Sequence, residues 1–125
     1  MNNPKKVEDA FYESFMSGYR VSEEWQKELY SYVVLGLPPG GFHTAVYAGD
    51  LMMAAAKSHV LNDWQNISSM CKWLMNVAPR QCWGSYENVE AWLKLSPAEH
   101  KKICLEKRLL YTEQEVVWNI IKEKS

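Results

Sequence analysis

Cysteine and histidine are scarce in this chain, and their spacing excludes several kinds of site. The sequence has three cysteines, Cys71, Cys82 and Cys104, and three scattered histidines. It contains no CxxC pair and no cluster with the ligand count of a structural zinc site, so we expect no metal and no cofactor. An odd number of cysteines argues against a disulfide framework and favours buried, reduced thiols.

Long apolar runs are also missing, as is an excess of charge of one sign. The apolar runs are far shorter than the roughly 20 residues that span a bilayer, and the first residues, MNNPKKVEDAF, lack the apolar core of a signal peptide. We therefore expect a cytoplasmic protein without membrane contact. The net charge of −1 argues against binding a polyanion through overall charge, so nucleic acid is the less favoured partner.

Aromatic residues and helical periodicity are abundant. Six tryptophans and seven tyrosines occur in 125 residues, and each tryptophan buries a large area while its N–H requires a partner. Apolar residues recur at spacings of three and four, whereas no alternating strand pattern exceeds four residues. These patterns predict an all-α fold, a compact irregular bundle of about six to seven helices forming a single domain over residues 1–125.

Start and stop signals divide the chain into seven expected helices. Ser22, Asn62 and Ser85 are suitable N-caps, while Ser96 and Thr112 open capping boxes. The expected segments cover residues 4–17, 22–36, 42–59, 62–78, a short helix after 85, 97–110, and 112 to beyond 121. The fourth of these is apolar over more than half of its circumference and is expected to lie at the centre.

The expected helix over 42–59 contains two residues that its pattern does not explain. Gly49 falls in its middle, where glycine costs about 1 kcal/mol relative to alanine, and a tight helix crossing would account for it. Asp50 lies at the edge of the apolar stripe. It is either a solvated charge or a group that reads a ligand hydroxyl.

Two glycine-led helix starts form the candidate ligand site. Free N–H groups at a helix start attract anions, and an arginine and a tryptophan beside them supply a phosphate contact and a surface for a ring to stack on. The alternative is that both are ordinary turns, with the tryptophan in the core and the arginine on the surface. The candidate ligand-binding residues are Gly40, Gly41, His43, Thr44, Arg80, Trp83, Gly84 and Ser85.

Catalytic and nucleic-acid sites have weaker support. His100 and Cys104 fall at i,i+4 and could share a helix face, but without further ligands a thiol near a surface histidine is the better interpretation. No nucleophile with an adjacent base is evident, so we do not expect an enzyme. A basic run, Lys101, Lys102, Lys107 and Arg108, either faces phosphates or forms a solvated face with Glu99 and Glu106.

Two segments, LPPGGFHTAVYAGDL and NVAPRQCWGSYENVEAWL, resemble a family of small uncharacterised tailed-bacteriophage proteins. The resemblance covers roughly residues 25–94, so the N-terminal helix and the last thirty residues look like additions. Gly49 and Met75 depart from the pattern of that family, which would reshape any pocket. The matching residues are Pro38, Pro39, Gly40, Gly41, Phe42, Ala45, Val46, Asp50 and Leu51, then Asn76, Ala78, Pro79, Cys82, Trp83, Gly84, Ser85 and Trp92.

The resemblance implies a phage accessory protein in the bacterial host cytoplasm, and such proteins often counter host defence. Within that class, the two helix starts favour a homo-oligomeric binder that sequesters a nucleotide-derived immune signal without turnover, with Trp83 or a neighbouring tyrosine stacking the base. One alternative is an inhibitor of a host defence complex that uses an exposed aromatic patch. Another is a replication or recombination accessory protein that binds nucleic acid through the basic run.

Overall fold

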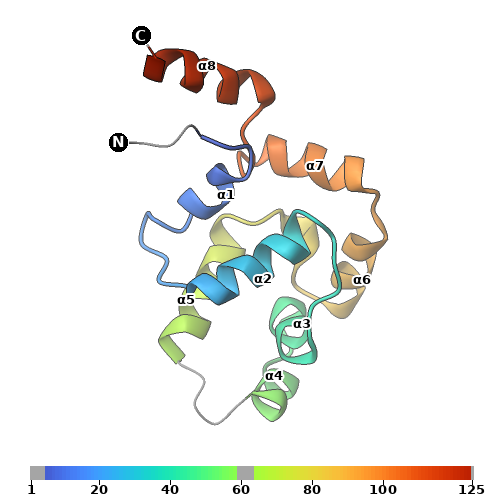
Figure 1. Cartoon of the computed structure of the whole chain (residues 1–125). Coiled ribbons are helices and arrows are strands. Elements are labelled where there is room, and N and C mark those ends of the chain that lie inside the picture. Colours follow the sequence, from blue (N-terminus) through green and yellow to red (C-terminus); the bar gives the residue numbers. More distant parts are fainter. Residues whose placement is uncertain (1–4, 59–63, 125) are drawn as a thin grey trace.

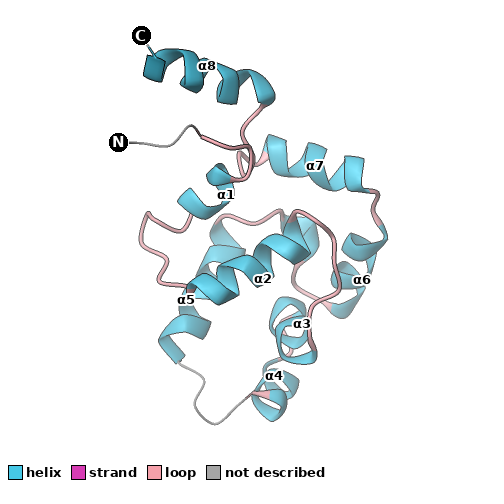
Figure 2. Cartoon of the chain, viewed as in Figure 1, coloured by secondary structure: helices cyan, strands magenta, loops and turns pink. Residues whose placement is uncertain are grey.

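The computed structural model describes residues 5–58 and 64–124, and every regular element within these ranges is a helix (Figures 1 and 2). The predicted all-α bundle is therefore confirmed. In chain order the elements are α1 (Asp9–Glu13), α2 (Glu23–Val33), α3 (Gly41–Ala48), α4 (Leu51–Lys57), α5 (Trp64–Asn76), the 3₁₀ helix η1 (Arg80–Cys82), α6 (Tyr86–Lys94), α7 (Pro97–Glu106) and α8 (Glu113–Lys124).

The predicted N-caps act as caps wherever they lie in the described ranges. The hydroxyl of Ser22 accepts a hydrogen bond from the Trp25 N–H at 3.3 Å, and that of Ser85 accepts one from the Asn88 N–H at 3.0 Å. At Thr112 the capping box is complete, because the Thr112 hydroxyl and the Glu115 carboxylate each bond the other's backbone N–H. Local polar chemistry thus fixes the starts of α2, α6 and α8.

The single helix expected over 42–59 is wrong, because two helices occupy that stretch. Gly49 adopts φ +77° and ends α3 in the left-handed conformation. Asp50 then caps α4, since its carboxylate accepts a hydrogen bond from the Met53 N–H at 3.0 Å. Gly49 is therefore a helix stop, which only glycine makes without strain. His59, Asn62 and Asp63 lie outside the described residues.

Other predicted helices are shorter than expected, above all the first and the sixth. The segment predicted over 4–17 contributes only Asp9–Glu13, and turns follow it up to Gly18; Pro4 lies outside the described residues. α7 ends at Glu106 instead of 110 because Arg108 takes a positive φ of 59°. The Leu109 N–H then bonds the Cys104 carbonyl at 2.8 Å, which closes the helix end.

Buried aromatic side chains hold the bundle together through their polar atoms as well as their rings. The hydroxyl of Tyr32 on α2 donates to the Cys82 carbonyl of η1 at 2.6 Å. The indole N–H of Trp92 on α6 donates to the Tyr32 carbonyl at 3.1 Å. On the other side of the core, the Trp73 ring of α5 stacks on Phe15. These bonds fix η1 and α6 against α2, because a buried carbonyl left without a partner is costly.

None of the helices in the described ranges has the length and apolar character that crossing a bilayer requires.

Candidate functional site

The turn between η1 and α6 hydrogen-bonds several of its own polar groups, although the buried Nε1 of Trp83 has no partner among the described residues. The Arg80 guanidinium lies 4.1 Å from the centre of the Trp83 ring, and its Nη1 donates to the Trp83 carbonyl at 3.3 Å. The Asn88 side-chain amide donates to the same carbonyl at 2.9 Å. Trp83 is half-buried against the core, and Gly84 has φ +109°. Arg80 therefore folds back onto its own turn by a cation–π contact and a hydrogen bond.

This turn lies against the far end of α3. The Gly84 N–H donates to the Tyr47 carbonyl at 2.8 Å, and a Cβ on Gly49 would lie 3.7 Å from the Gly84 carbonyl oxygen. Tyr47 and Gly49 are at the C-terminal end of α3, roughly 9–12 Å along the axis from its start at Gly41. The structure therefore places Arg80, Trp83, Gly84 and Ser85 together, but it does not bring them to Gly40–Thr44.

The start of α3 is less fully hydrogen-bonded than the η1–α6 turn. Gly40 offers no side-chain cap, and the first intrahelical bond runs from the Thr44 N–H to the Gly40 carbonyl at 2.9 Å. The Thr44 hydroxyl bonds the Pro39 carbonyl at 3.3 Å. The N–H groups of residues 41–43 come before that first bond, as at any helix start. The side chain of Lys57 lies beside the start of α3. A Cβ built on Gly41 would lie 3.5 Å from the Lys57 Nζ.

His43 belongs to the packed side of α3. Its ring meets the Trp25 ring edge-on at 5.1 Å, and its Nε2 is buried without a hydrogen-bond partner among the described residues. Burial lowers the pKa of His43, while Glu28 and Glu24 act weakly in the opposite direction. The imidazole therefore faces the protein interior rather than the open N–H groups at the helix start.

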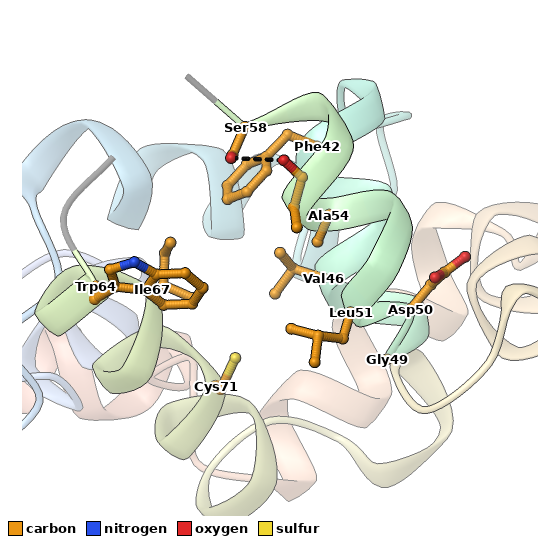
Figure 3. A pocket seen from close by; sticks show the side chains of 11 residues that line it. Phe42, Val46, Gly49, Asp50, Leu51, Ala54, Ser58, Trp64, Ile67 and Cys71 are labelled. Carbon is orange, nitrogen blue, oxygen red and sulfur yellow. Dashed lines mark hydrogen bonds between the residues drawn. The ribbon is translucent and has the colours of Figure 1, made fainter. Parts of the chain in front are cut away.

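A cavity of about 200 Å³ lies on the other side of α3, where α3, α4 and α5 meet (Figure 3). Its walls are almost entirely apolar. None of the eight candidate residues chosen from the sequence lines it, although Phe42, which does, follows Gly41 directly. The lining residues are Phe42, Val46, Gly49, Asp50, Leu51, Ala54, Ala55, Ser58, Trp64, Ile67 and Cys71.

Each wall of the cavity has a simple origin in helix periodicity. Phe42, Val46 and Gly49 lie at i, i+4 and i+7 on one face of α3. Ile67 and Cys71 are one turn apart on α5, and the Cys71 sulfur points into the cavity in Figure 3. The break at Gly49 lets α4 supply the third wall. A continuous helix over 42–59 could not have enclosed this space, so the cavity was not predictable from the helical pattern we expected.

Polar groups at the cavity edge are mostly occupied within the chain. The Asp50 carboxylate points away from the cavity in Figure 3 and accepts a hydrogen bond from the Tyr86 hydroxyl at 2.7 Å. This bond and the one from the Met53 N–H lower the pKa of Asp50. The Ser58 hydroxyl donates to the Ala55 carbonyl at 2.9 Å. Trp64, 68% exposed, stands at the mouth. The remaining interior is therefore a hydrophobic surface.

The three cysteines differ in accessibility. Cys82 and Cys104 are fully buried; burial raises the pKa of both thiols, that of Cys104 to about 12. Cys71 is half-buried, and burial raises its pKa as well. His100, expected at the surface near Cys104, is buried instead, and its Nε2 lies 2.6 Å from the Trp92 carbonyl. Within residues 5–58 and 64–124, no three His, Cys, Asp or Glu side chains form a group that could hold a metal.

The basic run on α7 and directly after it is partly engaged in contacts within the chain. Lys101, Lys102 and Lys107 are exposed, whereas Nη1 and Nη2 of Arg108 donate hydrogen bonds to the Glu115 carboxylate, at 2.9 and 2.7 Å. Glu99, expected among the partners of the run, accepts a hydrogen bond from the Ser96 hydroxyl at 3.2 Å. The four cations therefore do not form one uniform face.

The site that these contacts leave open consists of the apolar cavity and the adjoining start of α3. Lys57 precedes the cavity residue Ser58, and Gly41 precedes the cavity residue Phe42, so the cation and the free N–H groups border one end of the cavity. No protein-family model, curated protein or solved structure matches this chain.

Proposed function

We propose that this chain is a non-enzymatic binding protein for a small anionic ligand that carries a flat apolar or aromatic ring. One observation supports this proposal most strongly: an apolar cavity lies between α3, α4 and α5, and one of its ends adjoins an uncapped helix start crossed by a lysine. Small-molecule sites commonly combine apolar walls with a few placed polar groups. The arrangement here matches that description.

The ring would occupy the cavity. Cavities of about 150 Å³ lined by apolar side chains hold a single benzene ring, so about 200 Å³ accommodates one compact ring system. Phe42 and Ile67 offer it contacts from two helices, and the exposed Trp64 covers it from the mouth. Burial of such a ring supplies most of the binding free energy.

The anion would bind at the start of α3. Helix N-termini stabilise negative charge through their free N–H groups and the macrodipole. Lys57 adds a full positive charge there. Because Gly41 and Phe42 are neighbours in the chain, the anion and the ring of one small molecule reach both places at once.

A nucleotide-derived signal belongs to this class of ligand, since it joins a flat base to a phosphate. On the phage resemblance, the protein would be an anti-defence accessory that sequesters such a signal in the host cytoplasm without turnover. The site differs from the one expected from the sequence. Gly40 and Gly41 remain in it, while Arg80, Trp83, Gly84 and Ser85 are replaced by the cavity residues.

A fluorescence titration with two dyes tests the proposal. 1-Anilinonaphthalene-8-sulfonate carries an aromatic ring and an anion, whereas N-phenyl-1-naphthylamine has the same ring system without the charge. We expect saturable binding of both. Lys57→Gln should weaken the sulfonate roughly five-fold, the effect of about 1 kcal/mol for one exposed charge, and leave the neutral dye unchanged.

Two further variants complete that experiment. Ala54→Phe places a ring inside the cavity and should abolish binding of both dyes. Lys101→Gln removes an exposed lysine on α7, remote from the cavity, and should change neither affinity. Equal affinities in Lys57→Gln, Lys101→Gln and the unmodified protein would contradict the anion site. Undiminished binding in a folded Ala54→Phe protein would contradict the cavity.

A further inference from the structure

The two oxygen-bearing side chains that line the α3–α4–α5 cavity are engaged within the chain. The Ser58 hydroxyl donates its proton to the Ala55 carbonyl at 2.9 Å. The Asp50 carboxylate points away from the cavity in Figure 3 and accepts hydrogen bonds from the Tyr86 hydroxyl and the Met53 N–H. Among the described lining residues, neither group is therefore directed at a ring inside the cavity.

The backbone along the α3 and α4 walls is also used within the chain. The Val46 carbonyl accepts a hydrogen bond from the Gly49 N–H at 3.0 Å, and the Asp50 carbonyl accepts one from the Ala54 N–H at 2.9 Å. On α3, the N–H groups that come before the first intrahelical bond are those of residues 41–43. They lie at one end of the cavity, where the anion is proposed to bind, and not along its walls.

The remaining walls favour an aromatic ring. The Cys71 sulfur points into the cavity in Figure 3. Burial raises the pKa of this thiol, so it is neutral at pH 7 and only a weak donor and acceptor. Sulfur makes favourable contacts with the edges of aromatic rings. Phe42 and Trp64 add two aromatic side chains, and aromatic pairs attract one another beyond the effect of their buried area.

A nucleobase does not match these walls. Each base carries hydrogen-bond donors and acceptors along its edges, and enzymes that hold a single base in a pocket hydrogen-bond one of these edges. A base in this cavity would give up its hydrogen bonds to water without gaining equivalent ones from the described walls, which is unfavourable. The resemblance to phage proteins favours a nucleotide, whereas the chemistry of the cavity argues against one.

We propose that the ligand of this site is an aromatic acid: a single anion joined directly, or through one carbon, to an aromatic ring system without hydrogen-bonding groups. This inference rests on the proposed function and narrows its ligand class. A short link is sufficient because Gly41, at the helix start, directly precedes Phe42 in the cavity wall. A single anion matches the one positive charge of Lys57 beside Gly41.

Isothermal titration calorimetry of the full chain with two matched acids tests the ligand class. 2-Naphthoate has an apolar ring system, and quinoline-6-carboxylate has the same shape with one ring nitrogen that accepts a hydrogen bond. We expect 2-naphthoate to bind roughly ten- to a hundred-fold more tightly, since apolar pockets discriminate by up to about a hundred-fold against one added polar group. Adenosine monophosphate should bind more weakly than either acid. Equal affinities of the two acids, or tightest binding of the nucleotide, overturn the proposal.

Cys71→Ser tests whether the preference arises inside the cavity. The serine hydroxyl is a stronger donor than the thiol and offers the quinoline nitrogen a partner. The affinity ratio of the two acids should therefore narrow roughly three-fold, the effect of one modest hydrogen bond. Met75→Ser is the matched control, because Met75 is 65% exposed on the same helix and does not line the cavity. An unchanged ratio in Cys71→Ser, or equal narrowing in Met75→Ser, overturns the proposal.

The outcomes separate this inference from the proposed function. Saturable binding of the two fluorescent dyes, together with equal affinities of the two acids, would retain the site and reject the ligand class. Absence of binding for the dyes and the acids alike would reject both.

Discussion

The starts of α6 and α3 differ in how their polar groups are used. At the start of α6, Ser85 caps the helix and Gly84 donates to the Tyr47 carbonyl. Arg80, next to it, is held by Trp83. At the start of α3, Gly40 supplies no cap and a lysine from α4 crosses the helix end. A glycine-led helix start is available to a ligand only where the chain itself leaves the N–H groups unused.

The first prediction concerns Gly36, which lies between the end of α2 and the start of α3. Its φ is +68°, and a Cβ there would lie 2.2 Å from Cε1 of the buried His100. Gly36→Ala combines left-handed strain with overpacking, so we expect a loss of about 2–5 kcal/mol in the free energy of unfolding. Urea denaturation measures it.

Gly18→Ala is the matched control for Gly36→Ala. Gly18 also has a positive φ, +113°, but no atom of the described residues lies within 4 Å of a Cβ at that position. The control therefore measures strain alone and should cost clearly less. Similar losses in the two variants would show that the contact with His100 is not what requires glycine at 36.

The second prediction compares the glycines of the two helix starts directly. Gly84→Ala should lose about 1–3 kcal/mol, since its φ of +109° is strained for alanine. Gly40→Ala should change stability by less than about 0.5 kcal/mol, because Gly40 has φ −69° and open space around it. Thermal unfolding of both variants measures the two losses of stability. A larger loss of stability in Gly40→Ala than in Gly84→Ala would contradict the conclusion that the start of α6 is closely packed and the start of α3 is open.

The third prediction concerns His43 and pH. Burial lowers the pKa of His43 below its ordinary value of 6.5, so the folded state resists its protonation. The contribution of neutral His43 to the free energy of unfolding is fully present above pH 6.5. It is lost as the pH falls through 6.5 towards the pKa of the folded state. The urea midpoint should therefore fall in this range, and the fall should be smaller in His43→Gln.

The carboxylates act in a separate pH range, which isolates the histidine effect. Arg108 and the Thr112 N–H lower the pKa of Glu115 to about 2, from an ordinary value of 4.5. Stability linked to this group is present above pH 4.5 and disappears only below it. An unchanged slope in His43→Gln between these two ordinary values would contradict the buried position of His43.

The fourth prediction involves the smallest change and leaves the fold intact. Among the three thiols, Cys71 should react first with a disulfide reagent in the native protein, because Cys82 and Cys104 are fully buried. The other two should react only on unfolding. 1-Anilinonaphthalene-8-sulfonate in the cavity should slow labelling of Cys71, and mass spectrometry of the labelled peptide identifies the site. Faster labelling of Cys104 would contradict the packing around α7.

Sequence patterns were sufficient for the fold class and for the N-caps of several helices. The caps at Ser22, Ser85 and Thr112 depend on side chains that reach only a few residues along the chain, so they follow from the sequence. Gly49 was misread because glycine inside a helix and glycine after one differ only in backbone conformation. The following Asp50 was the available signal for a new start.

The features that were not predicted depend on contacts between residues far apart in the chain. The cavity requires α4 to turn back at Gly49 and face α5, and neither event appears in the periodicity of any one helix. The position of Gly84 against Tyr47 joins residues 37 apart in the chain. The contact of Arg80 with Trp83, three residues on, was local enough to be expected. We assigned both residues to a ligand because each has a suitable side chain, whereas the Arg80 guanidinium is held by the Trp83 ring and carbonyl.

The most direct test of whether a ligand binds at the start of α3 or at the start of α6 is a ¹H–¹⁵N correlation spectrum titrated with 1-anilinonaphthalene-8-sulfonate. We expect saturable shifts at the amides of Gly41, Phe42 and Val46 on α3, and of Ala54 and Ile67 across the cavity. The amides of Trp83, Gly84 and Ser85 should shift little. Shifts concentrated at residues 80–85, with Phe42 and Ile67 unmoved, would contradict it and return the ligand to the η1–α6 turn.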